Sequence, residues 1–376
     1  MIIGIDGNEA NLEVRVGVNQ YCHELLTVIR KLEDEWKSKH KIVVYLREKP
    51  KNFMPESSNN FYYKVISGSG AWIIRRLIPD LFFSSPKPRV FFSPSHYVPP
   101  FSPVPLVCAI HDLGYLEFSE QFEKYDFWQL KYWSAWSIFI SKRIISVSNS
   151  TMKDIVRHYP FASKKIRVVH HGNDSSRFNQ LIADKDVRRI KEKYSIVKDY
   201  VLYLGTLKPS KNVEGLLAAW KEVKRTFPNY SLVVAGKKGW LYGSIFERVQ
   251  ELGLTKDVIF TDYVSEEEKP VLIKGAKLFI LPSFWEGFGM DVLHALACGV
   301  PVVVSNVASL PEVAGAAGIY VDPKNTESIA TGIVKVLSMP EKQYNKLVKQ
   351  GLARVKGFSW EKTARETLKV LEEAAE

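Results

Sequence analysis

The stretch from Phe279 to Val304 constrains the fold of this chain more than any other. Residues 277–281 form an apolar, branched run that favours a buried parallel strand. Gly287 and Gly289 then allow a tight turn in which a ligand can approach the main chain closely. From Met290, apolar residues recur at helical spacing, and a second apolar strand follows. This succession predicts parallel strands covered by helices.

The glycine-rich turn is also a candidate ligand site. The main-chain N–H groups at the start of a helix have no partner within the helix, so they attract anions and other oxygen atoms. Glu286 adds a carboxylate at this turn, beyond the end of the first strand. The same residues could serve only to cap the helix, and spacing alone leaves both interpretations open.

The letters of this stretch resemble a known motif. The run E-G-F-G-x(4)-H-A-L-A-C-G-x-P-V resembles the signature of the family 4 retaining glycosyltransferases. In that family, a glutamate at each end of an E-x(7)-E spacing contacts the donor sugar and the nucleotide ribose. Glu286 matches the first glutamate, whereas His294 occupies the place of the second. The resemblance implies a catalytic Glu286 and further donor contacts by Gly287, Phe288, Gly289, Met290 and His294.

The resemblance covers essentially the whole chain and implies the GT-B architecture, an α/β fold in which two Rossmann-like domains face each other across a cleft. At 376 residues, the chain is too long for one compact core and suits two domains. We expect an acceptor-side domain over residues 1–175, completed by a crossover helix over 359–376. Residues 176–358 are expected to form the nucleotide-sugar-binding domain.

The first strand is followed by a second motif. Residues 2–6 are strand-like, and Gly17 precedes a helix with an apolar stripe. The run R-V-G-V-x-x-Y resembles the family's first strand–loop–helix turn, where a glycine lets the donor phosphate or the acceptor come close, which implies donor binding near Gly17. A G-x-G-x-x-G run is missing at this turn, and this weighs against a dinucleotide oxidoreductase.

A histidine follows another expected strand. Residues 105–110 lead into His111-Asp112-Leu113, and ligands of α/β sheets bind at the carboxyl ends of strands. A lone histidine is more often structural, but H-D-L also resembles the family, whose histidine helps to orient the donor sugar. We therefore expect a catalytic His111. His96, in S-P-S-H-Y, could face the acceptor.

The loop from Gly205 to Asn212 lies between a strand and a helix. A glycine and cations before a helix start suit a diphosphate, because N–H groups and an ammonium neutralise oxygen charge. The loop resembles the family pattern G-x-x-x-P-R-K-N, in which Lys211 matches the phosphate-binding lysine and Ser210 replaces the arginine. The resemblance thus implies a catalytic Lys211 and donor contacts by Gly205, Thr206, Lys208, Ser210 and Gly236.

Ser210 and His294 are departures from the family pattern. A hydrogen bond to a charged group is worth about 1.5–3 kcal/mol, so the two changes together could weaken donor binding by about 3–6 kcal/mol. Lys208 could replace the missing positive charge. His294 could still hydrogen-bond one ribose hydroxyl, although it cannot accept two hydrogen bonds as a carboxylate can.

The resemblance implies transfer of a hexose, such as mannose, from a nucleotide-diphosphate sugar to a glycan or lipid-linked acceptor. It further implies retention at the anomeric carbon, no metal, and no cofactor besides the sugar nucleotide, with GDP or UDP as the favoured nucleotides. Two alternatives remain: a weak or silent relative that binds nucleotide or a partner, and a GT-B sugar-nucleotide epimerase. Nucleic-acid binding is not expected, because no recognised motif accompanies the net charge of +11.

Cysteine usage and charge bear on location. Three widely spaced cysteines without metal-ligand spacing indicate reduced thiols and a cytoplasmic protein. The apolar window 127–140 is too short to span a bilayer, and its aromatic residues are expected to pack on the sheet. The run 71–83 contains Arg75 and Arg76 among aromatic residues and could lie on the inner face of the membrane, although a core helix is the favoured interpretation.

Overall fold

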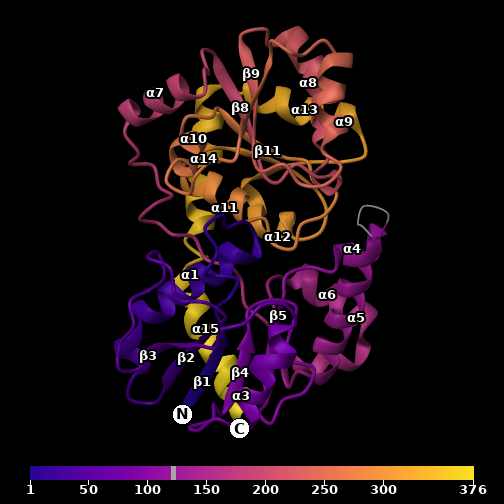
Figure 1. Cartoon of the computed structure of the whole chain (residues 1–376). Helices are drawn as coiled ribbons and strands as arrows, with labels where there is room; N and C mark the ends of the chain where they lie inside the picture. The colour runs from indigo at the N-terminus through magenta and orange to yellow at the C-terminus, as the bar shows by residue number, and fades with distance from the viewer. Residues whose placement is uncertain (120–123) are drawn as a thin grey trace. The chain divides into compact units, whose positions relative to one another are not determined.

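The computed structural model describes residues 1–119 and 124–376. The chain forms two compact units, which are drawn together in Figure 1. Unit 1 comprises Met1–Gly172 and Trp360–Glu376, and unit 2 comprises Asn173–Ser359. Each unit is built on one parallel sheet flanked by helices, as expected for Rossmann-like domains.

The sheet of unit 1 has seven parallel strands in the order β3-β2-β1-β4-β5-β6-β7. Ile5 lies opposite Val44 on one side and Phe92 on the other. Every residue of β4 and β5 is buried, because helices cover both faces of the sheet. The strands are β1 (Ile2–Asp6), β2 (Lys41–Leu46), β3 (Phe61–Val65), β4 (Val90–Ser93), β5 (Leu106–Ile110), β6 (Arg143–Ser146) and β7 (Ile166–Val168).

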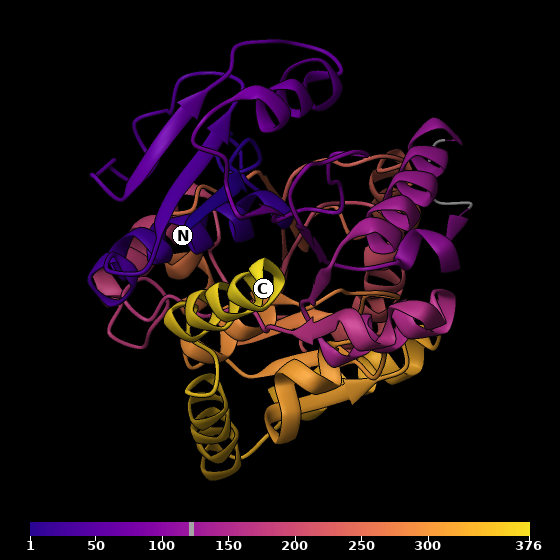
Figure 2. The same ribbon diagram turned by 90° about the horizontal axis from the view of Figure 1, so that it is seen from below.

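The helices of unit 1 come from both ends of the chain. They are α1 (Val18–Lys31), α2 (Glu33–Trp36), a π-helical turn (Ile73–Leu77), α3 (Ile78–Phe83), α4 (Gly114–Glu117), α5 (Lys124–Ile140), α6 (Asn149–His158), a 3₁₀ helix (Pro160–Lys165) and α15 (Trp360–Ala375). The predicted return of the C-terminal helix is confirmed, because α15 belongs to unit 1, packs beside α1, and pairs with α2 through Arg365 and Glu35 at 2.8 Å. Figure 2 shows α15 in yellow.

The segment that ends in α3 is mainly a core element. Trp72, Leu77 and Leu81 are buried, whereas Arg75 and Arg76 are exposed, as expected for a core helix with its arginines in water. Part of the apolar surface of this segment nevertheless remains accessible to solvent.

The aromatic residues of helix α5 lie on both its buried and its exposed side. Phe127 and Leu130 pack against the core of unit 1, as expected. The aromatic residues Trp128 and Tyr132 are exposed instead. The predicted packing of this helix against the sheet is therefore confirmed, and part of its aromatic residues lie on the opposite, exposed side.

The sheet of unit 2 has six parallel strands in the order β10-β9-β8-β11-β12-β13. Its first strand, β8, lies between β9 and β11, so the strand order reverses direction at β8 and β11. Ligands of open α/β sheets bind at the carboxyl ends of strands at such a switch point. The strands are β8 (Asp199–Leu204), β9 (Tyr230–Ala235), β10 (Val258–Asp262), β11 (Leu278–Leu281), β12 (Val302–Ser305) and β13 (Gly318–Val321).

Helices connect these strands. They are α7 (Asp184–Lys193), a 3₁₀ turn (Pro209–Lys211), α8 (Val213–Thr226), α9 (Gly243–Glu251), α10 (Lys269–Lys274), α11 (Met290–Ala297), α12 (Leu310–Ala314), a second 3₁₀ turn (Gly315–Ala317), α13 (Thr326–Leu337) and α14 (Glu341–Val355). Trp220 of α8 is fully buried in the core of this unit. Over residues 1–119 and 124–376, no helix is long and apolar enough to cross a membrane.

Candidate functional site

A lysine and a glutamate meet at the switch point of unit 2. The loop after β8 carries Lys211 and the loop after β11 carries Glu286. The Nζ atom of Lys211 lies 2.6 Å from Oε1 of Glu286, and the Ser283 hydroxyl donates to the same oxygen at 2.8 Å. The structure therefore brings together two of the three predicted catalytic residues, in the crevice where the sheet topology places a ligand.

The turn after β11 has a fixed main-chain shape. The Ser309 Oγ atom lies 2.8 Å from the carbonyl oxygen of Glu286 and 3.0 Å from that of Phe288. Gly289 has a φ of 93°, and a β-carbon there would come within 2.8 Å of the Leu310 side chain. Only glycine suits this position, both for its backbone conformation and for the space available.

The other predicted residues of this turn have different surroundings. The Phe288 side chain is buried and lies edge-on to Phe358, with 5.8 Å between ring centres. Gly287 precedes it, and Met290 begins α11. The main chain of the turn, rather than the buried Phe288 ring, is thus the part that can contact a ligand.

The loop after β8 lies against the loop after β9. Gly205 N donates to the Ala235 carbonyl at 3.0 Å, and a β-carbon on Gly236 would clash with the carbonyl oxygen of Gly205. This contact explains the predicted importance of both glycines, because the two loops can touch only without a side chain between them. Thr206 continues the loop, and its carbonyl accepts a hydrogen bond from the Tyr203 hydroxyl at 3.4 Å.

Two residues near Lys211 differ in what they offer a ligand. The Lys208 Nζ atom lies 4.8 Å from the centre of the Trp240 ring, a cation–π contact. The Ser210 carbonyl accepts from Phe284 N at 2.9 Å, which joins the two site loops. The positive charge of Lys208 therefore lies over an indole ring, and its role in replacing the missing arginine stays a prediction.

Asn212 fixes the start of α8 and was not among the predicted site residues. It has a left-handed backbone with a φ of 54°. Its amide Nδ2 donates to the carbonyls of Pro282, at 3.1 Å, and Pro323, at 2.7 Å. Asparagine is one of the few residues that tolerate this backbone, and its place before an apolar helix was the available signal.

His294 is held on α11 by an aromatic ring and a carboxylate. Its ring stacks on Phe178, with 3.8 Å between ring centres and an interplanar angle of 3°. Its Nδ1 lies 3.5 Å from Oδ1 of Asp291, one helical turn earlier. Burial favours a raised pKa for Asp291, but the His294 imidazole and the Lys269 ammonium outweigh burial and lower this pKa. Sequence reasoning missed Asp291 and Phe178.

In unit 1, His111 follows β5 and is buried. Its Nε2 lies 2.9 Å from the carbonyl oxygen of Pro94, so this nitrogen carries the proton that it donates. Burial, with a smaller contribution from His96, lowers the pKa of His111 to about 4. At neutral pH the ring is uncharged, and its Nδ1 is a hydrogen-bond acceptor.

Other rings surround His111. Tyr21 of α1 lies edge-on to it at 4.8 Å between ring centres, His171 lies 4.7 Å from Tyr21, and His96 lies 5.7 Å from His111. The carbonyl of Gly17 accepts from Tyr21 N at 3.1 Å. Gly17 has a φ of 52°, and a β-carbon there would meet no atom within 4 Å. Gly17 and His111 are thus linked through Tyr21, beside open space.

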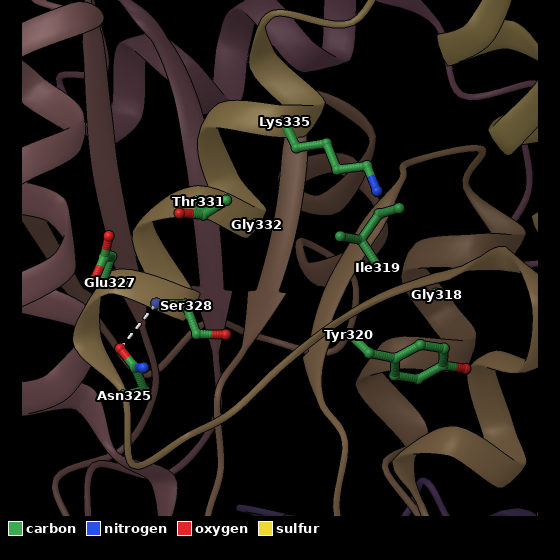
Figure 3. A pocket seen from close by; sticks show the side chains of 9 residues that line it. All are labelled: Gly318, Ile319, Tyr320, Asn325, Glu327, Ser328, Thr331, Gly332 and Lys335. Atoms are coloured by element: carbon green, nitrogen blue, oxygen red, sulfur yellow. Dashed lines mark hydrogen bonds between the residues drawn. The ribbon is translucent and has the colours of Figure 1, made fainter.

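The predicted residues therefore form one group in each unit, and the side chains of Lys211 and Glu286 are in direct contact. Over the described ranges, no cluster of three or more His, Cys, Asp or Glu side chains is arranged to hold a metal ion. A separate pocket of unit 2 lies between β13 and α13, where Ser328 N donates to Asn325 at 3.1 Å (Figure 3). Its lining contains none of the predicted donor-binding residues.

Two family models match the chain. Residues 17–177 match the model described as Glycosyltransferase Family 4, and residues 186–354 match that of Glycosyl transferases group 1. A similar curated protein is O-antigen chain mannosyltransferase B of Escherichia coli, 33% identical over 235 residues, or 62% of this chain. The matched region spans 61% of that relative, which is less than two thirds of its length.

Solved structures resemble the whole chain. Sucrose-phosphate synthase of Thermosynechococcus elongatus superposes with a TM-score of 0.75 at 18% identity, covering 99% of this chain and 98% of the other. Anabaena HepE in complex with UDP-glucose gives a TM-score of 0.74 at 16% identity, covering 99% of each chain. These likenesses agree with the two parallel sheets and show the expected GT-B fold.

Proposed function

This chain belongs to the family 4 glycosyltransferases, and we propose that it transfers a hexose from a nucleotide-diphosphate sugar to a glycan or lipid-linked acceptor. The observation that carries the proposal is the contact between Lys211 and Glu286 at the carboxyl ends of β8 and β11. A cation beside a carboxylate suits a donor that bears a diphosphate at one end and sugar hydroxyls at the other.

In the proposed reaction, the acceptor oxygen forms a bond to the anomeric carbon while the bond from that carbon to the diphosphate oxygen breaks. Lys211 stabilises the negative charge that develops on the departing diphosphate. Glu286 accepts hydrogen bonds from sugar hydroxyls, and the neutral His111 offers its Nδ1 as a further acceptor. The acceptor attacks from the same face that the diphosphate leaves and passes its proton to a phosphate oxygen. Attack from that face gives retention without a protein nucleophile or a metal.

The donor is proposed to be a GDP- or UDP-linked hexose, with mannose first among the sugars. The mannosyltransferase named above supports mannose, and the HepE complex with UDP-glucose supports a nucleotide-diphosphate donor. The Nδ1 of His294 faces Asp291, which leaves Nε2 to hydrogen-bond one ribose hydroxyl. We place the reaction in the cytoplasm, with the enzyme bound peripherally at the inner face of the membrane.

The first test is the melting temperature of the protein with UDP-, GDP-, ADP- and dTDP-sugars in turn. A donor that binds the folded state raises the melting temperature by mass action. The stabilising donor is then incubated with candidate acceptors with and without EDTA, and the anomeric configuration of the product is determined by NMR. Transfer with retention that EDTA leaves unchanged is the expected result.

Other outcomes identify the alternatives. Stabilisation by a donor, followed by an altered sugar and free nucleotide in the absence of any acceptor, would indicate an epimerase. Nucleotide binding without turnover would indicate a silent relative. If no donor raised the melting temperature, the serine at 210 and the histidine at 294 would have disabled the donor site.

A further inference from the structure

Helix α5 of unit 1 buries small polar residues and exposes several large aromatic ones, although Phe127 and Leu130 pack against the core. Ser134, Ser137 and Ile138 are buried on the inner face, and the Ser137 hydroxyl accepts a hydrogen bond from Val98 N at 3.2 Å. A helix that only covers a sheet turns its largest apolar residues inward. The large aromatic residues exposed on the outer side of α5 call for a second contact there.

The outer side of α5 is an almost unbroken aromatic stripe. The residues lie three or four positions apart, so they share one face of the helix. The Trp128 and Tyr132 rings stack with 5.3 Å between centres. Phe161 of the adjacent 3₁₀ helix extends the stripe and lies 5.9 Å from Phe139. We call this surface the outer aromatic face; its α5 residues, with exposed fractions, are Tyr125 (76%), Trp128 (47%), Tyr132 (64%), Trp136 (41%) and Phe139 (57%).

Lysines lie among these rings. The Lys131 Nζ atom lies 5.0 Å from the centre of the Trp128 ring. The Lys165 Nζ atom lies 5.8 Å from the Phe161 ring and donates to the Phe139 carbonyl at 2.6 Å. Among the carboxylates whose side chains the structure describes, none lies within ion-pair distance of either lysine. Neither positive charge is therefore neutralised by one of these carboxylates.

We propose that the outer aromatic face binds the surface of a membrane that contains anionic lipids. Indole and phenol rings prefer the interface between hydrocarbon and water, because one part of each is apolar and another forms hydrogen bonds. Lys131 and Lys165 add attraction to lipid phosphates, as does the net charge of +11. The contact does not depend on the transfer reaction, although it would serve the lipid-linked acceptor proposed above.

A lipid surface suits this face better than a second copy of the chain. A two-fold contact would bring the lysines of one copy close to those of the other, and both copies carry the same positive charge. An anionic surface complements these lysines instead. Figure 1 shows α5 on the outer flank of its sheet.

Flotation with vesicles of equal parts phosphatidylcholine and phosphatidylglycerol tests the proposal. The wild-type chain should float with these vesicles at low salt and much less with pure phosphatidylcholine. The double variant Trp128→Ser/Tyr132→Ser should partition about tenfold more weakly, because two interfacial rings are lost. The matched control is Ile74→Ser/Phe83→Ser, which removes exposed apolar residues from the segment around α3 and should float like the wild type.

The failing outcomes are distinct. A wild-type chain that is stabilised by a sugar nucleotide but does not float would overturn the membrane contact and leave the proposed reaction intact. Equal losses in both double variants would also contradict it, because the outer aromatic face would then not be the binding surface. Light scattering that showed a wild-type dimer and a monomeric Trp128→Ser/Tyr132→Ser variant would assign the face to a second copy.

Discussion

The two groups of candidate residues are built in opposite ways. In unit 2, Lys211 and Glu286 are charged, in direct contact, and carried by loops. In unit 1, His111 is a neutral ring packed among other rings. A charged pair can respond to charge that develops during a reaction, whereas a buried neutral ring contributes shape and one defined hydrogen-bond acceptor. We therefore expect substitution of the charged pair in unit 2 to lower turnover, and substitution of His111 in unit 1 to change the pH dependence of stability.

Replacing Lys211 should give the largest effect. The variant Lys211→Met removes the cation that stabilises the departing diphosphate, and kcat should fall about 100- to 1000-fold, or about 3–4 kcal/mol. Initial rates of donor consumption with saturating acceptor provide the measurement. Lys221→Met, at an exposed position on α8, is the matched control and should keep full activity. If kcat fell less than tenfold in Lys211→Met, Lys211 would not have the proposed catalytic role.

Replacing Gly236, which allows two loops of unit 2 to touch, should give the second-largest effect. In Gly236→Ala, the new methyl group meets the carbonyl oxygen of Gly205, and we expect a loss of about 3 kcal/mol in the free energy of unfolding. Urea unfolding measures this loss. Gly243→Ala adds the same methyl group where no atom lies within 4 Å, so it should change stability little. Similar stabilities of the two variants would show that the loops are not in contact.

The neutral His111 ring of unit 1 should make the free energy of unfolding depend on pH. The pKa of His111 is about 4 in the fold, below its usual value, so the unfolded chain binds more protons between these values. This contribution to stability is complete above about pH 6.5 and is lost as the pH falls toward 4. Between about pH 7.5 and pH 5, the wild type should lose about 2 kcal/mol more than His111→Gln. Parallel losses in urea unfolding would mean that His111 is not held neutral.

Replacing Phe178, whose ring stacks on His294 in unit 2, should give the smallest effect. Phe178→Leu keeps an apolar side chain but removes the stack on His294, and donor affinity should weaken by about 1 kcal/mol, or about fivefold. Titration with the stabilising donor gives the affinity. Phe227→Leu removes another ring contact of unit 2, with Tyr230, and should leave donor affinity unchanged. If the wild type and both variants bound the donor with equal affinity, His294 would not be part of the donor site.

Much of the fold could be predicted because its signals are local. Apolar, branched runs followed by glycine or proline indicated the strands, and the turn at Gly287 and Gly289 indicated a helix start. The family motifs indicated Lys211 and Glu286, which the structure places in contact. For these two residues, as for the rest of the predicted site, ligand contacts remain predictions.

The missed residues depend on contacts between distant segments. Asn212 donates to carbonyls that lie 70 and 111 residues further along the chain, and Ser309 contacts a turn 23 residues earlier. Every residue has a main-chain carbonyl, so the residue types do not show which carbonyl a side chain will contact. Helix α5 shows a second reason. Its sequence reveals the aromatic residues, but the neighbouring elements decide which face is buried.

The position of α15 has a consequence for synthesis on the ribosome. Most of unit 1 is made before unit 2, yet α15 covers α1 and strands β4, β5 and β6 of the same unit. Until residues 360–376 have emerged, that apolar surface stays in water, while unit 2 has all of its own chain available earlier. Unit 2 should thus be able to complete its folding before unit 1, which makes nascent unit 1 a ready substrate for chaperones.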